Sequence, residues 1–307
     1  PIDGETQTHG THTAGIAAGS GAEGNGDISP YRGMACDADL VLVDNAADNA
    51  SLIDPKDYYK FTYATDALGF KYIFDYAERM HQPCVINFSE GSSQDFHGYD
   101  QLYYELLAKL IGPGRIIVSS AGNDGARNSY IHKNIGKERA GAFIMGNEKR
   151  FSCTAKSKQT FTFRVSVYDN VASPQIVDIS TVNVCNAQDS LLTDSLLVGG
   201  KKYIWRVLAY PNSYDTSETA YDIQISSPSK LGDSPQVSLQ VMGRDADIEL
   251  YRMSGYMFPH SLDPVLDAGD CRYTIFSPSS SPDVICVGST SYRTQFVNYL
   301  GEKKVYD

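Results

Sequence analysis

Two histidines lie three positions apart near the start of the sequence. They are His9 and His12, in a segment that reads THGTHTAG. The ordinary pKa of imidazole lies close to neutral pH, so a histidine here could act as a general base or bind a metal ion. Gly10 and Thr11 stand between them, so the H-E-x-x-H pattern of zinc proteases is absent, and no third ligand is indicated. Ordinary helix surface is the third interpretation.

The composition excludes several classes of protein. The chain has 307 residues, of which 42% are hydrophobic and 21% charged, as in ordinary globular proteins. Its formal net charge is -11, so we expect no nucleic-acid partner, because such binding needs a basic face. No apolar run is long enough to predict a membrane span. The 6 cysteines include no C-x-x-C pair, which favours free buried thiols over a zinc site and leaves one disulfide open.

The first part of the chain, residues 1–138, alternates two kinds of pattern. Short apolar runs typical of buried strands occur at 38–45, 83–89 and 114–123, and helical patterns occur at 62–80 and 99–112. Strands and helices that alternate at this spacing predict a parallel sheet covered on both faces. We expect the inner face of the first helix to be apolar at Ala67, Phe70, Ile73, Phe74 and Ala77, and that of the second at Leu102, Leu106 and Leu110.

The pattern changes over residues 139–272 and then returns. Short runs with period-two alternation, separated by turn signals, predict an antiparallel β-sandwich or jelly-roll-like domain. These runs are 159–169, 202–210, 220–226, 237–243 and 246–252. From 273 to 307 the first character returns, with an apolar run at 281–290 that suggests another buried strand. The expected fold is therefore an α/β domain, residues 1–138 and 273–307, interrupted by an inserted β domain.

Three separated segments resemble motifs of the subtilisin-like serine protease (subtilase) family. HGTHTAGIAAG at 9–19 resembles the histidine motif, and VINFSEGS at 85–92 resembles the strand that walls the substrate cleft. VSSAGNDG at 118–125 resembles the oxyanion-asparagine segment. The stretches at 32–45 and 281–291 follow the family pattern in the same order. The resemblance covers everything outside 139–272, and implies a three-layer subtilisin-like fold.

The resemblance implies roles for particular residues. His9 matches the catalytic base, Asn123 matches the side-chain donor to the oxyanion, and His12 becomes a packed helix residue. The walls of the pocket for the residue before the scissile bond match Ser89, Glu90, Gly91, Ser120, Ala121 and Gly122. The implied substrate is a protein or peptide. Because Glu90 is acidic, the pocket wall is expected to favour basic substrate side chains. The implied location is secreted or cell-envelope. No cofactor or metal is expected, with a structural calcium ion left open.

The sequence also departs from the family pattern. The family's aspartate motif, which orients the histidine, has no match before His9, and the G-T-S-M-A type motif of the nucleophile has no match after it. Ser289 and Ser291 align with a strand end, so we do not expect either to be the nucleophile. The 307 residues are therefore expected to be a middle slice of a catalytic domain, inactive alone.

Two hypotheses of different classes follow. The first is a serine endopeptidase that acts through an acyl-enzyme, in which the inserted domain gates the cleft, binds a partner or aids folding. The second is a pseudoprotease scaffold whose inserted β domain binds protein or carbohydrate. Retention of the histidine motif and of Asn123 favours the first.

Overall fold

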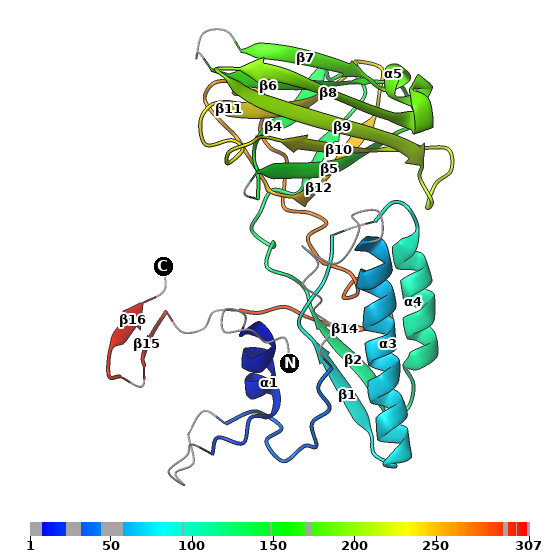
Figure 1. The fold of residues 1–307 in the computed structure, drawn as a ribbon, viewed down its shortest axis with the longest axis vertical. Coiled ribbons are helices and arrows are strands. Elements are labelled where there is room, and N and C mark those ends of the chain that lie inside the picture. The colour runs from blue at the N-terminus through cyan, green and yellow to red at the C-terminus, as the bar shows by residue number, and fades with distance from the viewer. Residues whose placement is uncertain are drawn as a thin grey trace.

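The computed structural model describes residues 8–22, 32–43, 58–93, 95–147, 149–169, 174–290, 294–298 and 300–305. A small parallel sheet with helices occupies one end of the molecule, and two antiparallel sheets occupy the other (Figure 1). No helix in the described part of the chain is both long and apolar enough to cross a membrane.

The parallel sheet has three strands in the order β1-β2-β14. They are β1 (Cys84–Phe88), β2 (Arg115–Ser120) and β14 (Ile285–Val287). Helices α3 (Tyr58–Arg79) and α4 (Tyr99–Leu110) stand against one face of the sheet (Figure 1). Side chains from both helices meet those of β1 and β2 in one core, whose buried members include Phe70, Phe74, Tyr103, Leu107, Ile86 and Ile117. The predicted first helix, its inner face and these two strands are therefore confirmed.

The opposite face of this sheet is covered much less than predicted. Because side chains alternate along a strand, Val85 and Ile116 point away from α3 and α4, and they are 65% and 39% exposed. All three residues of β14 are exposed, so the expectation of a buried strand within 281–290 is wrong. Helix α1 (His9–Ala18) lies on this side of the sheet (Figure 1).

Two further local expectations differ from the structure. Of the predicted strand at 38–45, the described residues 38–43 form no strand, and Leu42 is 72% exposed. None of these residues pairs with a described strand of the parallel sheet, so they make no strand-to-strand hydrogen bonds with it. In α4, Tyr103 and Leu107 form the buried face, whereas Leu102 and Leu106 are exposed. The aromatic ring of Tyr103 contributes more apolar area than a leucine, and it packs at a tilt against the ring of Tyr63 of α3, with centroids 4.9 Å apart.

The chain between β2 and β14 forms two antiparallel sheets. The six-stranded sheet has the order β3-β12-β5-β10-β9-β8, and the five-stranded sheet has the order β13-β4-β11-β6-β7. The bounds are β3 (Tyr130–Lys133), β4 (Arg139–Met145), β5 (Arg150–Ser157), β6 (Thr162–Tyr168), β7 (Gln175–Ser180), β8 (Leu191–Val198), β9 (Lys201–Pro211), β10 (Thr219–Ser226), β11 (Gln236–Met242), β12 (Ile248–Ser254) and β13 (Tyr256–Phe258).

Alternate residues of the two antiparallel sheets build one shared core. Trp205 and Ile223 come from the six-stranded sheet, and Phe163 and Leu239 come from the five-stranded sheet. The period-two pattern read from the sequence is therefore confirmed as strands whose alternate apolar side chains enter this core. A short helix, α5 (Thr181–Asn186), and a 3-10 turn at Gln188–Ser190 connect β7 to β8. A hairpin of β15 (Gln295–Val297) and β16 (Lys303–Val305) follows β14.

The cysteines only partly match their expectation. All 6 thiols are free, but only Cys153 is buried. Cys286 lies on the exposed strand β14, so its apolar neighbours in the sequence did not predict burial.

Candidate active site

Helix α1 begins at His9, and a backbone loop fixes its other end. Both His9 and His12 are exposed on this helix, so the expectation that His12 is a packed helix residue is wrong. At the carboxyl end, the backbone N–H of Gly33 donates to the carbonyl of Gly19 at 2.8 Å. A Cβ at Gly33 would lie 2.3 Å from the Gly19 nitrogen, so only glycine allows this close approach. The histidine helix is thereby tied to the segment that follows it.

The two predicted pocket walls leave neighbouring parallel strands at the same edge. Phe88 of β1 is the register partner of Ser119 of β2, so Ser89 and Ser120 are the next residues on adjacent strands. Such carboxyl-end edges are where open α/β sheets bind ligands. Glu90, in the first pocket wall, is exposed.

Backbone hydrogen bonds hold the second wall from both sides. The N–H of Ala121 donates to Val287 of β14 at 2.9 Å, and its carbonyl accepts from the N–H of Phe276 at 3.2 Å. Gly122 has a φ of +100°, a backbone conformation that favours glycine. Asn123 follows at an exposed bend, so its amide is open to solvent.

The side chain of Phe276 lies against both pocket walls. A Cβ at Gly122 would meet the Phe276 ring at 2.8 Å, and one at Gly91 would meet the Phe276 Cβ at 2.9 Å. The next residue, Ser277, pairs with Ser92 through two backbone hydrogen bonds of 2.9 and 3.0 Å. Sequence reasoning missed Phe276, and its only local signal is an aromatic residue just before a Ser/Pro turn.

A buried ion pair fixes the residue after Asn123. Asp124 accepts from Arg252 Nη2 at 2.6 Å and from Arg127 Nη1 at 2.7 Å. Arg252 belongs to β12 of the antiparallel sheets and also donates to the Ser129 hydroxyl at 3.0 Å. The carboxyl-end loop of β2 is therefore anchored by a side chain far along the sequence, which no local pattern indicates.

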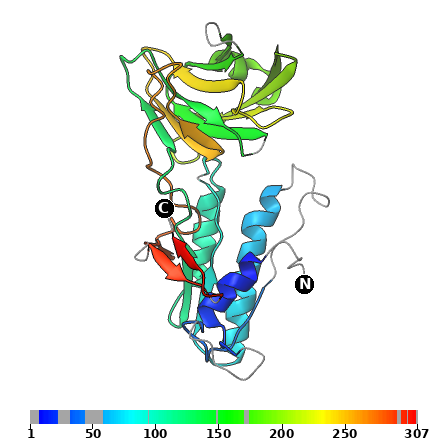
Figure 2. The ribbon, with the colours of Figure 1, turned by 90° about the vertical axis from the view of Figure 1, so that its left-hand side faces the viewer.

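His9 lies at the same end of the parallel sheet as the two pocket walls, as the start of α1 shows. α1 begins at the end of the parallel sheet where β1 and β2 end (Figures 1 and 2). No hydrogen bond between His9 and Asn123 occurs among the described contacts. Ser289 is exposed just after β14, and Ser291 lies outside the described residues. Within the described ranges, no group of three or more His, Cys, Asp or Glu side chains could hold a metal ion.

Comparisons with known proteins match one family model and two relatives with protease names. The model of the subtilase family matches residues 2–230. Subtilisin from Bacillus sp. (strain TA39) is 34% identical over 128 residues, which are 41% of this chain and 26% of that protein. The Serine protease/ABC transporter B family protein tagB of Dictyostelium discoideum is 28% identical over 121 residues, which are 38% of this chain and 6% of that protein.

A solved structure is similar over nearly the whole chain. It is the CspB protease of Clostridium perfringens, with a TM-score of 0.59 and 18% identity, covering 92% of this chain and 56% of that one. At this identity the likeness shows the fold alone. The sequence spans about a quarter of the Bacillus relative, at 26% of its length. Because the subtilase model matches most of the residues, the chain belongs to the subtilase family.

Proposed function

We propose that the whole protein is a serine endopeptidase that hydrolyses peptide bonds through an acyl-enzyme. The observation that carries this proposal is the adjacency of the two wall segments, 89–91 and 120–123, at the carboxyl edge of β1 and β2. A substrate backbone at this edge would lie beside Asn123, while the exposed imidazole of His9 begins the helix at the same end of the sheet. Membership of the subtilase family supports the reaction class.

The proposed chemistry divides between two groups of this chain. The imidazole of His9 accepts the hydroxyl proton of a nucleophilic serine as its oxygen attacks the carbonyl carbon, and later returns the proton to the leaving amine. The side-chain amide of Asn123 donates a hydrogen bond to the oxyanion that forms. The serine and the orienting aspartate match no motif in the 307 residues, so this proposal takes them from sequence outside the segment. The location we propose is secreted or cell-envelope.

The substrate we propose is a protein or peptide with a small residue before the scissile bond. The ring of Phe276 occupies space between Gly91 and Gly122, where a larger substrate side chain would otherwise enter. The predicted preference for basic residues, from Glu90, is secondary, because Glu90 is exposed and its charge is screened by water.

We also propose that the antiparallel part is a jelly roll inserted into the protease domain. Leaving out β8, β9 and β13, the sheets read β3-β12-β5-β10 and β4-β11-β6-β7. Numbered along the chain, these are strands 1-8-3-6 and 2-7-4-5, the order of a jelly roll. The domains were predicted as 1–138, 139–272 and 273–307. Because β3 pairs with β12, the first boundary of this proposal moves to about residue 129.

A fluorophosphonate probe, which labels active serine nucleophiles, tests the proposed function. We expect the whole protein to be labelled and to degrade casein, and the 307-residue chain to do neither. Labelling of the short chain at Ser289 or Ser291 would overturn the assignment of the nucleophile elsewhere. A whole protein that carries both missing motifs and is neither labelled nor active would instead support the pseudoprotease scaffold.

A further inference from the structure

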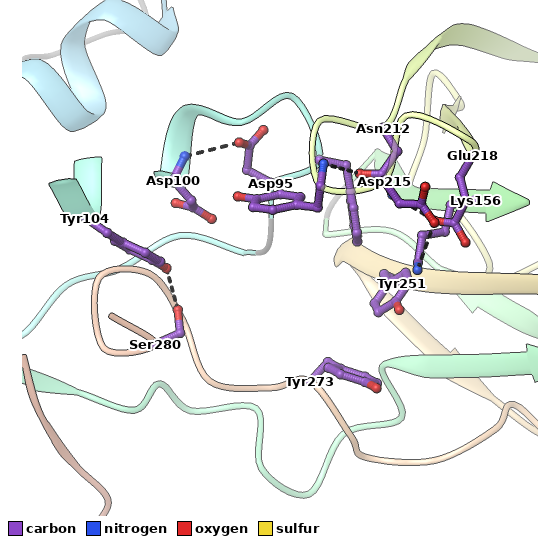
Figure 3. Close-up of a pocket in the computed structure, with 12 residues that line it drawn as sticks. Asp95, Asp100, Tyr104, Lys156, Asn212, Asp215, Glu218, Tyr251, Tyr273 and Ser280 are labelled. Carbon is purple, nitrogen blue, oxygen red and sulfur yellow. Dashed lines mark hydrogen bonds and ion pairs between the residues drawn. The ribbon is translucent and has the colours of Figure 1, made fainter. Parts of the chain in front are cut away.

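A hollow lies where the parallel-sheet part meets the antiparallel sheets (Figure 3). Its volume is ≈ 410 Å³, within the range of small-ligand sites. The start of α4 forms one side, and β5, β12 and the turn between β9 and β10 form the other. Tyr273 and Ser280, in the segment that leads to β14, also line the hollow. None of the predicted active-site residues lines it.

Aromatic rings supply most of the apolar wall. Phe96 and Tyr251 lie with ring centroids 4.9 Å apart, and Tyr251 lies 5.3 Å from Tyr273. Tyr214 is 52% exposed and lines the same hollow. A cation already lies near one of these rings, because Lys156 Nζ is 5.9 Å from the Tyr251 centroid. The wall therefore offers ring faces of the kind that attract cations.

The charges in the hollow are mostly negative, and most are already compensated. Asp95 accepts the backbone N–H groups of residues 97, 99 and 100 at the start of α4. Glu218 pairs with Lys156 at 3.2 Å. The same ammonium group also binds Glu249 at 2.6 Å, so the only cation among the lining residues is shared by two carboxylates. Asp215 pairs with Lys158 at 3.3 Å.

Asp100 is the carboxylate that lacks this compensation. It is 5% exposed, and its Oδ1 atom is buried with no hydrogen-bond partner among the described residues. Burial raises the pKa of this carboxyl group. An ionised carboxylate buried without a partner is costly, and a donor that enters the hollow would offset that cost. Asp100 lines this hollow and a neighbouring one that also contains Ser277 and Tyr273.

We infer that the hollow binds an organic cation, the guanidinium or ammonium group of an arginine or lysine side chain. The charged group pairs with Asp100, and the alkyl stem lies against Tyr214 and Tyr251. An inorganic ion fits poorly, because aromatic rings form much of the wall and the described residues hold no metal-ligand cluster. The cation comes either from a basic residue of a bound polypeptide or from a free polyamine. This site does not depend on the proposed protease activity.

Isothermal titration of the whole protein tests the site with matched probes. N-acetylarginine amide carries the guanidinium of a peptide residue, N-acetylcitrulline amide is its neutral isostere, and spermidine represents a free polyamine. We expect the arginine probe to bind about tenfold or more tightly than the citrulline probe. Tighter binding of spermidine would assign the source as a free polyamine. Equal affinity for the arginine and citrulline probes, or no binding of any cation, would overturn the inference.

Variants locate the binding within the hollow. Asp100→Asn keeps the shape and removes the charge, and we expect it to weaken arginine binding about tenfold. Tyr214→Leu changes an exposed ring without disturbing the core, so it tests the aromatic wall independently of the charge at Asp100. The control is Asp194→Asn, an exposed carboxylate on β8 outside the hollow, which should leave affinity unchanged. Unchanged affinity in both test variants would place the cation elsewhere and refute the site.

Discussion

Arg252 of β12 forms a buried ion pair with Asp124, the residue that directly follows Asn123. The Nη2–Oδ2 distance is 2.6 Å, and the two side chains are 6% and 8% exposed. Arg252 also donates to the carbonyls of Asn128 and Gly255. The loop at the carboxyl end of β2 is therefore held by the antiparallel sheets and not only by its own strand.

Replacement of Arg252 by methionine should destabilise the fold strongly. The change leaves Asp124 buried with only the partly exposed Arg127 as a charged partner, and breaking such a pair typically costs about 3–5 kcal/mol. Denaturant unfolding measures the change in the free energy of unfolding. The matched control is Arg272→Met, whose pair with Asp270 at 2.8 Å is exposed, so little change is expected. Similar losses in the two variants would show that burial of the first pair is unimportant.

Asp100→Asn should stabilise the ligand-free protein near neutral pH. Burial raises the pKa of Asp100 above its unfolded value, and the nearby charge of Asp95 raises it further, while the polar side chains of Ser277 and Tyr63 oppose the shift. Above the raised pKa the ionised side chain costs stability, and below the unfolded pKa both states are protonated and the cost is absent. The thermal midpoint of Asp100→Asn should therefore exceed that of the parent at about pH 7 and match it at about pH 3. A gain that persists unchanged in acid would contradict this origin.

Phe276→Ala should enlarge the side chains that the proposed protease accepts. Removal of the ring opens the space between Gly91 and Gly122, so kcat/KM for leucine or phenylalanine before the scissile bond should rise about tenfold or more relative to alanine. Profiling of the whole protein on a peptide library measures this shift. Tyr72→Ala, which removes an exposed ring from α3, is the control and should leave the profile unchanged. A Phe276→Ala profile identical to the parent would remove this residue from the pocket.

Glu90→Gln should change the profile only weakly. Glu90 is exposed at the first pocket wall, so its attraction for basic substrate residues should be worth at most about 1 kcal/mol. The relevant quantity is the ratio of kcat/KM for arginine to that for glutamine substrates, which should fall by about fivefold or less. A larger fall would mean that Glu90 becomes buried beside the bound substrate.

Local patterns predicted the elements whose signal lies within one segment. The spacing of Phe70 and Phe74 gave the first helix and its buried face, and the alternation of Phe163 and Val165 gave a strand of the shared core. In α4 the leucine spacing was only partly right, because Leu110 packs against the core whereas Leu102 and Leu106 are exposed and Tyr103 is buried instead. Burial of the Tyr103 ring removes more apolar area from water than burial of a leucine, and the gain in free energy grows with that area.

Features that join distant segments could not be read from the sequence. Phe276 reaches the walls at Gly91 and Gly122 only because its segment pairs with residues far earlier in the chain. The ion pair of Arg252 and Asp124 joins residues separated by 128 positions, and each looks like an ordinary surface charge in its local context. The roles of His9 and Asn123 came from family resemblance, so they stay predictions that need a direct test.

The most direct test compares two histidines on the same helix of the whole protein. We predict that His9→Ala lowers kcat/KM for a peptide substrate by about 10⁴-fold or more, because the base that activates the serine is lost. His12→Ala removes an imidazole that is also exposed, three residues away, and should leave kcat/KM within about threefold of the parent. Retention of activity in His9→Ala, or an equal loss in both variants, would contradict the assignment of His9 as the catalytic base.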